Sequence, residues 1–181
     1  MTDKEILEMF SKSESQNNAF NILIEQYQRR IYWHVRKLVI DHDDANDITQ
    51  DTFIKVWKSL SNFKGESQLF TWIYRIATNE SLNHLAKKKK NLHQSLDTMF
   101  ETISNNLEST DMISGEEIQI KLQKALLQLP DKQRAVFNMK YYDDLKYEDM
   151  SEITGTSVGA LKASYHLAVK KIEDFFNKTD T

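Results

Sequence analysis

The sequence predicts an all-α protein built from two small helical domains joined by a polar linker. Its 181 residues suit one domain or two small ones. Apolar residues make up 40% of the chain and charged residues 28%, with four glycines and one proline, a balance typical of helices joined by few tight turns. Apolar residues also recur every three or four positions in two long stretches, and this periodicity is lost between them.

The N-terminal stretch predicts three helices. The apolar face of the first consists of Phe20, Leu23, Ile24, Tyr27, Ile31, Val35 and Leu38. The run Asp41–Asp44 ends that helix and begins a second one that reaches about Leu60, since aspartates are favoured in a first helical turn. The polar segment Ser61–Ser67 predicts a loop, and Ser67 is a candidate N-cap for a third helix from Leu69 to about Lys89.

The C-terminal stretch predicts four further helices. Periodicity returns at Ile118, and Pro130 ends the first of these helices because it lacks an amide donor. A second helix runs to Tyr141 and a short third one covers residues 147–154. Gly155 supplies a turn, and Ser157 is the expected N-cap of a last helix that ends near residue 176. We therefore expect domains at residues 1–90 and 116–181, with residues 91–115 as the linker.

Charge is unevenly distributed along the chain. Residues 1–90 carry a net charge of +2, residues 91–115 carry four acids and no base, and residues 116–181 carry −1. Five aspartates lie between Asp41 and Asp51 without any Lys or Arg. A calcium loop is excluded there, because Asn46 and Thr52 occupy its sixth and twelfth positions. The run is either a solvated helix start or an acidic face for a basic protein surface.

Residues 147–176 read as helix, glycine turn, helix. This order is typical of a helix-turn-helix that places its second helix in the major groove of DNA, and equally of an ordinary helical hairpin. From Ser157 to Ile172 the charged residues are three lysines and no acid, with His166 among them. The one-sided charge favours the DNA-binding interpretation.

Residues 63–90 combine aromatic side chains with basic ones. Single-stranded nucleic acid is bound by stacking on aromatic rings within a basic groove. The alternative is that Phe70, Trp72 and Ile76 are core residues and that the lysines form a solvated helix end. We expect most of the aromatics to be core, with Phe63 in its polar loop as the exception.

The sequence shows no motif for metal binding or catalysis and no membrane-spanning segment. The five histidines lack metal-ligand spacing, there is no cysteine, and no phosphate-binding loop or nucleophile motif occurs. No leader and no apolar run near ~20 residues is present. We expect a cytoplasmic protein that is not an enzyme, holds no cofactor or metal, and does not insert into a membrane.

Six strings resemble the extracytoplasmic-function (ECF) sigma factors of bacterial RNA polymerase. The strings DANDITQDTFIKVW (44–57), FKGES (63–67) and TWIYRIATN (71–79) are similar to region 2 of that family. The strings LPDKQRAVF (129–137), YEDM (147–150) and SVGALK (157–162) are similar to its region 4. Both sets occur in the family's order and at its spacing, over about residues 10–90 and 116–176.

The resemblance implies three sets of site residues. The residues that would bind the β′ coiled coil of core RNA polymerase are Asp44, Asp47, Gln50, Asp51, Phe53 and Trp57. Those that would bind and melt the −10 promoter element are Phe63, Lys64, Ser67, Arg75, Asn79 and Asn83. Those that would read the −35 element are Ser157, Gly159, Lys162, His166 and Lys170. The β flap and an anti-sigma factor are further partners implied by the family, and the acidic linker would run near the active-site cleft.

The chain also departs from the family in its last helix. Ala163 and Ser164 follow the SVGALK string where many members have arginine, and Ala160 replaces a frequent threonine. Fewer cations release fewer counterions, so we expect weak −35 binding by the isolated C-terminal domain. Two other functions stay open at this point: a stand-alone helix-turn-helix regulator and a helical adaptor that does not bind DNA.

Overall fold

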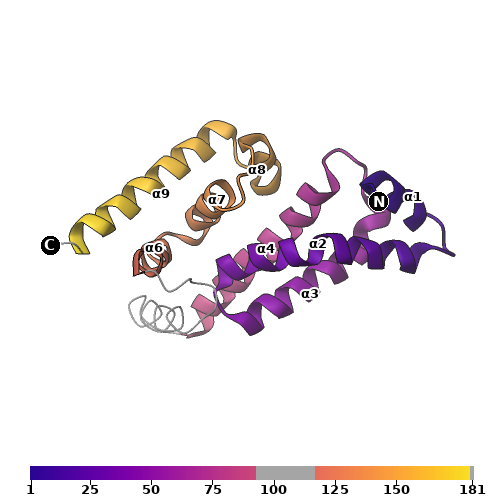
Figure 1. Cartoon of the computed structure of the whole chain (residues 1–181), viewed down its shortest axis with the longest axis horizontal. Helices are drawn as coiled ribbons and strands as arrows, with labels where there is room; N and C mark the ends of the chain where they lie inside the picture. Colours follow the sequence, from indigo (N-terminus) through magenta and orange to yellow (C-terminus); the bar gives the residue numbers. More distant parts are fainter. Residues whose placement is uncertain (93–116, 180–181) are drawn as a thin grey trace. The chain divides into compact units, whose positions relative to one another are not determined.

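A computed structural model describes residues 1–92 and 117–179, and the described residues fold into helices joined by short turns (Figure 1). Their contacts separate into an N-terminal and a C-terminal compact unit. The predicted all-α class is confirmed. Apart from Asn91 and Leu92, which end a helix, the predicted acidic linker lies outside the described residues.

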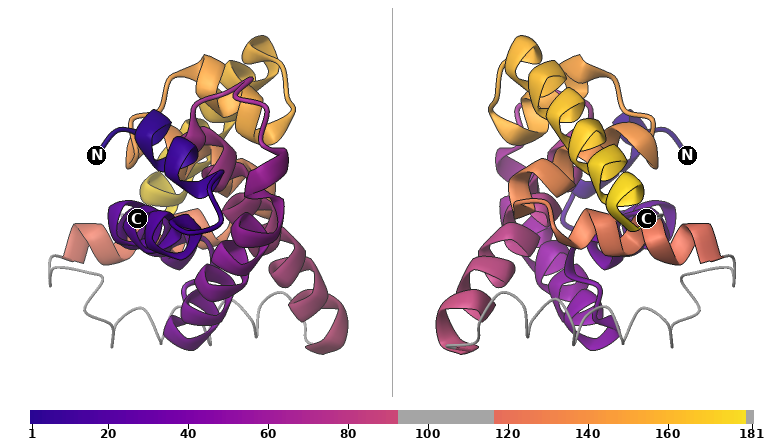
Figure 2. Two further views of the ribbon diagram at one scale, coloured as in Figure 1. Left: turned by 90° about the vertical axis from the view of Figure 1, so that its right-hand side faces the viewer. Right: turned by 90° about the vertical axis from the view of Figure 1, so that its left-hand side faces the viewer.

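Four α-helices and one short 3-10 turn make up the N-terminal part. They are α1 (Asp3–Phe10), α2 (Gln16–Val39), α3 (His42–Ser59), η1 (Leu60–Asn62) and α4 (Leu69–Leu92). Helix α2 packs on both α1 and α3 (Figures 1 and 2). Helix α4 begins two residues after Ser67, so Ser67 lies just before the cap position rather than on it.

Helix α1 is the element that the periodicity analysis missed. It begins with a capping box, in which the Thr2 hydroxyl accepts a hydrogen bond from the Glu5 amide and the Glu5 carboxylate accepts one from the Thr2 amide. Ile6 and Phe10, one turn apart, are buried. The Tyr27 hydroxyl of α2 donates a hydrogen bond to the Asp3 carboxylate, and burial together with Asp3 raises the pKa of Tyr27. These contacts fix α1 against α2.

The turn from α2 to α3 is strained. Ile40 has φ 68° and ψ −43°, values that a β-branched residue rarely adopts. The amide of Asp41 donates to the carbonyl of Val39 at 2.8 Å, which closes a γ-turn. Asp41 then caps α3, its carboxylate accepting from the Asp44 amide at 2.9 Å. The buried Ile40 side chain and this cap hold the strained turn, which sets the direction of α3.

Buried polar and aromatic side chains join α2 to α4. The His34 ring stacks on Tyr74 at 3.8 Å between centroids, and His34 Nε2 lies 2.8 Å from Thr78 Oγ1. Tyr27 also contacts the ring of Phe70. Of the α4 aromatics, Tyr74 is buried and Phe70 and Trp72 are half-buried, so the expectation that most of them are core residues is met only in part.

The C-terminal part of the described chain contains α6 (Glu117–Leu127), α7 (Asp131–Tyr141), α8 (Tyr147–Thr154) and α9 (Val158–Thr179). Helices α6 and α7 both pack on α9 (Figures 1 and 2). The buried core residues include Leu126, Leu129, Phe137, Ala168 and Ile172. Pro130 separates α6 from α7, as predicted.

The turn between α8 and α9 has the predicted chemistry. Gly155 ends α8 with φ 69° and ψ 16°, a left-handed conformation that favours glycine. The Ser157 hydroxyl accepts a hydrogen bond from the Ala160 amide at 3.2 Å and so caps α9. The structure thus holds a helix-turn-helix at the place where the sequence indicated one.

The described residues contain neither a membrane-spanning helix nor a cluster of metal-ligand side chains. Across residues 1–92 and 117–179, no helix is long and apolar enough to cross a membrane. In the same part of the chain, no three His, Asp or Glu side chains cluster in a way that could hold a metal ion.

Candidate functional site

Helix α3 presents an acidic face. Asp47, Gln50 and Asp51 are exposed, and Asp44 is half-buried in the first turn. Their spacing of three and four residues aligns them along one side of the helix. In this arrangement the three carboxylates can attract a basic protein surface together.

An apolar groove of about 400 Å³ borders the acidic face. The residues that line it are Phe20, Ile24, Gln28, Thr49, Gln50, Phe53, Ile54 and Trp57. Ile54 is 51% exposed at its edge, so the apolar lining of the groove extends to the protein surface. Gln50 belongs to both surfaces, so the acidic face and the groove are continuous. The combination suits a partner segment with apolar residues flanked by basic ones.

Aromatic packing shapes the groove from within. Trp57 contacts Phe10 at 5.4 Å and Phe20 at 4.9 Å between ring centroids, both in edge-to-face geometry. Phe53 is only 6% exposed. Of the predicted binding residues, Phe53 and Trp57 therefore form the floor of the groove rather than its rim.

Three residues that line the groove were not predicted for this site: Phe20, Ile24 and Ile54. Phe20 and Ile24 were expected in the core of α2, whereas both line the groove. The signal for Ile54 was present: it is an apolar residue three positions after Asp51, on the acidic side of α3.

The loop before α4 carries a half-buried aromatic residue. The ring of Phe63 lies 5.0 Å from that of Trp72, so Phe63 is anchored to α4 while part of its surface reaches solvent. Gly65 has φ 71°, which turns the chain between Lys64 and Ser67. Lys64 is exposed and Ser67 is half-buried.

Helix α4 extends this surface with polar side chains. Arg75, Asn79 and Asn83 are exposed and follow one another at intervals of four residues, on the same side of α4 as Trp72. Because Phe63 contacts Trp72, the loop and α4 form one surface that carries Phe63, Arg75, Asn79 and Asn83. Cation, amides and an accessible ring are the groups that bind an unstacked base and its phosphate.

Helix α9 presents a single exposed face, here called the α9 face. It consists of Gly159, Lys162, Ala163, His166 and Lys170, all exposed at the spacing of one helical side. Four of these residues belong to the predicted set, and Ser157 caps the helix just before them. Two lysines and one histidine give this face a low density of positive charge.

Tyr147 and Tyr165 make contacts next to the α9 face. The Tyr147 ring lies 5.6 Å from Lys162 Nζ and 4.8 Å from Lys140 Nζ. Tyr165 stacks on Phe137 at 5.7 Å between centroids. Burial, with the neighbouring Tyr147 and Tyr141, raises the pKa of Tyr165.

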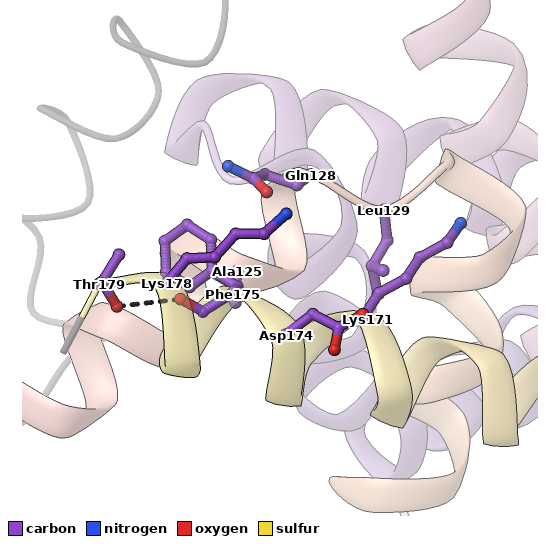
Figure 3. A pocket seen from close by; sticks show the side chains of 8 residues that line it. All are labelled: Ala125, Gln128, Leu129, Lys171, Asp174, Phe175, Lys178 and Thr179. Atoms are coloured by element: carbon purple, nitrogen blue, oxygen red, sulfur yellow. Dashed lines mark hydrogen bonds between the residues drawn. The ribbon is translucent and has the colours of Figure 1, made fainter. Parts of the chain in front are cut away.

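A second groove lies between α6 and the last turns of α9. Its volume is about 530 Å³, and Figure 3 shows its lining residues Ala125, Gln128, Leu129, Lys171, Asp174, Phe175, Lys178 and Thr179. Lys171 Nζ donates to Gln133 of α7 at 3.1 Å. The sequence assigned no function to these residues. The groove mixes an apolar floor with charged edges, and it occupies a different part of α9 from the α9 face.

Family comparisons match both parts of the chain. The sigma-70 region 2 family matches residues 23–91, and the sigma-70 region 4 family matches residues 119–172. The RNA polymerase sigma-H factor of Pseudomonas aeruginosa is 28% identical over 180 residues, which cover 94% of this chain and 92% of that protein. The ECF RNA polymerase sigma factor SigW of Bacillus subtilis is 29% identical over 157 residues, which cover 82% of this chain and 84% of that protein.

Two solved structures share the fold. The sigma factor RpoE of Bartonella quintana, in complex with the anti-sigma factor NepR, has a TM-score of 0.66 and 20% identity, covering 87% of this chain and 96% of that one. CnrH, in complex with the cytosolic domain of CnrY, has a TM-score of 0.69 and 18% identity, covering 97% of both chains.

Proposed function

The chain belongs to the sigma-70 family, in its ECF branch, and from this premise we propose that it binds core RNA polymerase and directs promoter-specific initiation. In this role it recognises DNA and does not catalyse a reaction, and it acts in the bacterial cytoplasm. Its domains are residues 1–90 for polymerase and −10 binding and residues 116–181 for −35 binding.

The continuity of the acidic face with the apolar groove on α3 carries the proposal. The acidic face attracts the basic β′ coiled coil and orients it, and the groove supplies the apolar contact area that gives affinity. Both features lie inside the region 2 match. A stand-alone DNA-binding regulator would not need an exposed isoleucine beside three acids.

The loop–α4 surface supports −10 recognition. We propose that Phe63 stacks on a base that has left the duplex, while Asn79 and Asn83 donate to base edges and Arg75 neutralises a phosphate. Binding of an unstacked base favours melting of the duplex, because the bound base can no longer pair with the opposite strand.

The α9 face supports −35 recognition. Lys162 and His166 are placed to contact base edges or phosphates from the N-terminal half of α9, and Lys170 lies further along the same side. Contact with the β flap is assigned to the groove between α6 and α9, which leaves the α9 face open to DNA. The low charge of that face makes promoter binding depend on the polymerase.

An anti-sigma partner is part of the proposal. Two proteins with this fold were solved with an anti-sigma factor or the cytosolic domain of another protein bound. An inhibitor that covers the apolar groove of α3 would exclude core polymerase from the same surface. The contribution proposed for the acidic linker near the active-site cleft concerns residues outside the described part of the chain.

Co-elution with bacterial core RNA polymerase tests the proposal. The wild-type chain is expected to co-elute, and Asp47→Ala/Asp51→Ala is expected to lose binding. The matched control is Glu14→Ala/Glu25→Ala, which removes two exposed acids away from α3. Failure of the folded wild-type chain to bind would favour the stand-alone regulator, and equal losses in both variants would contradict the role of the acidic face.

A further inference from the structure

One face of α2 combines an exposed aromatic residue with positive charge. Trp33 is 42% exposed at its centre. Residues three and four positions apart are neighbours on a helix surface. All four such neighbours of Trp33 are cations, namely Arg29, Arg30, Arg36 and Lys37. None of the residues predicted for the −10, −35 or polymerase sites lies on α2.

The four cations differ in their exposure and contacts. Arg29 and Arg30 are exposed, and within residues 1–92 neither forms an ion pair. The Arg30 guanidinium lies 3.8 Å above the Phe70 ring, which holds it along the protein surface. Arg36 is 6% exposed, and its Nη1 has no hydrogen-bond partner among the described residues. The face therefore concentrates positive charge over about 12 Å of helix.

The Trp33 ring is oriented by neighbouring side chains but stays accessible to solvent. The Tyr32 ring meets it in edge-to-face geometry at 5.3 Å, and the Tyr32 hydroxyl lies 2.7 Å from His42 Nδ1 at the start of α3. An indole is usually buried, because its large apolar surface gains from removal from water. In the described part of the chain no cation stacks on this ring. The exposed indole is thus oriented by its neighbours while its surface remains accessible.

A base and its flanking phosphates match this pattern. Aromatic side chains bind unpaired bases by stacking, and surrounding cations bind the backbone. Duplex DNA would engage the cations alone, because its bases are stacked inside the helix. An acidic protein surface would also pair with the cations, but it would have no need of an accessible indole. The observations therefore favour a single strand.

We propose that the α2 face binds single-stranded nucleic acid, with Trp33 stacked on one base and Arg29, Arg30 and Lys37 on adjacent phosphates. This contact goes beyond the −10 and −35 sites and does not depend on them. It is independent of base sequence, since every base offers a flat face to the indole. In an initiation complex it would give a melted strand a second point of attachment.

Tryptophan fluorescence tests the proposal in the full chain. The variant Trp57→Phe/Trp72→Phe leaves Trp33 as the only tryptophan. Titration with a 12-nucleotide oligothymidine is expected to quench its emission, with an affinity that falls as salt rises. Replacing Trp33 by leucine in the wild-type chain is expected to weaken binding of the labelled oligonucleotide about tenfold, with the salt slope unchanged.

Charge variants separate this face from general electrostatics. Arg29→Gln/Arg30→Gln is expected to reduce the salt slope by about 1.4, since each phosphate contact on a single strand contributes about 0.7. The matched control Lys12→Gln/Lys58→Gln removes two exposed cations elsewhere and is expected to leave the slope unchanged. The helical circular dichroism of each variant checks folding.

Several results would overturn the proposal. They are absence of Trp33 quenching, equal losses in the control, or loss of core polymerase binding by Arg29→Gln/Arg30→Gln with oligonucleotide binding intact. The last result would make the face a protein contact instead. Failure of the wild-type chain to bind polymerase would count against the proposed function and leave the Trp33 result unaffected.

Discussion

The acidic face with its groove on α3 and the α9 face are built in different ways. Three helices form the first, joined by the contacts of Trp57 with Phe10 of α1 and Phe20 of α2. One helix forms the second, and its position depends on the Gly155 turn and the Ser157 cap. The first surface is a product of tertiary packing, and the second is largely local.

This difference predicts where mutations act. A change buried far from the α3 surface should alter the groove, because the aromatic cluster transmits it. A change near the α9 face should act only on the residues next to it. In the proposed function the packed surface also provides most of the affinity, through polymerase, while the local surface provides selectivity with few charges.

The largest effect is expected for Phe10→Ala. Deleting this buried ring removes a partner of Trp57 and of Phe20, and such truncations cost about 3–5 kcal/mol of unfolding free energy. Chemical denaturation measures the loss, and co-elution should show weaker polymerase binding by the variant that remains folded. Phe10→Leu, which keeps most of the volume, should lose much less. Unchanged polymerase affinity in folded Phe10→Ala would mean that the groove does not depend on α1.

A second test addresses the groove without touching the core. Ile54→Glu adds charge at an exposed edge, so stability should change by less than about 0.5 kcal/mol. Polymerase affinity should fall about a hundredfold, because the glutamate would have to be desolvated in the contact. Leu167→Glu on α9 is the matched control, since Leu167 is also 51% exposed. Equal losses in both variants would show that the groove has no special role in polymerase binding.

Local patterns in the sequence predicted most of the fold. Helical periodicity places the helices, and the ends and turns between them depend on single residues such as Pro130, Gly155 and Ser157. Each of these acts on the nearby backbone, so the local sequence was enough to predict the helix ends and the turn. The γ-turn at Ile40 could not be predicted from neighbouring residues, because a β-branched residue adopts positive φ only where tertiary contacts impose it. Helix α1 was predictable, since Thr2 and Glu5 form a capping-box pattern, but eight residues are too few for a periodicity argument.

The candidate sites also differ in how much of them local sequence patterns could predict. The α9 face and the line of Arg75, Asn79 and Asn83 follow helical spacing, so sequence analysis could place their members on one side of a helix. The groove combines side chains from α2 and α3, and its extent depends on how two helices pack. That is why Phe20 and Ile24 of α2 were not predicted for this site, and why Phe53 lies deeper than a binding residue on an isolated helix would.

A smaller effect is expected at the turn before α9. Gly155 has φ 69°, and a Cβ there would meet no atom within 4 Å, so Gly155→Ala costs only backbone strain. We expect a loss of about 1 kcal/mol in unfolding free energy, measured by chemical denaturation. Gly155→Asn should lose less, because asparagine tolerates the left-handed region. A loss above about 3 kcal/mol would show that the turn is coupled to the rest of the unit.

The smallest effect is expected for Lys162→Gln, measured as binding of holoenzyme to promoter DNA at several salt concentrations. One lost phosphate contact should reduce the salt slope by about 0.9, with little change in stability because Lys162 is exposed. Lys132→Gln, on α7 and outside the α9 face, is the matched control and should leave the slope unchanged. A loss that occurs with the cognate −35 sequence and disappears when one −35 base is altered, at constant slope, would instead make Lys162 a base contact. Either result keeps the effect local to α9, whereas weaker binding to core polymerase itself would break the contrast between the two surfaces.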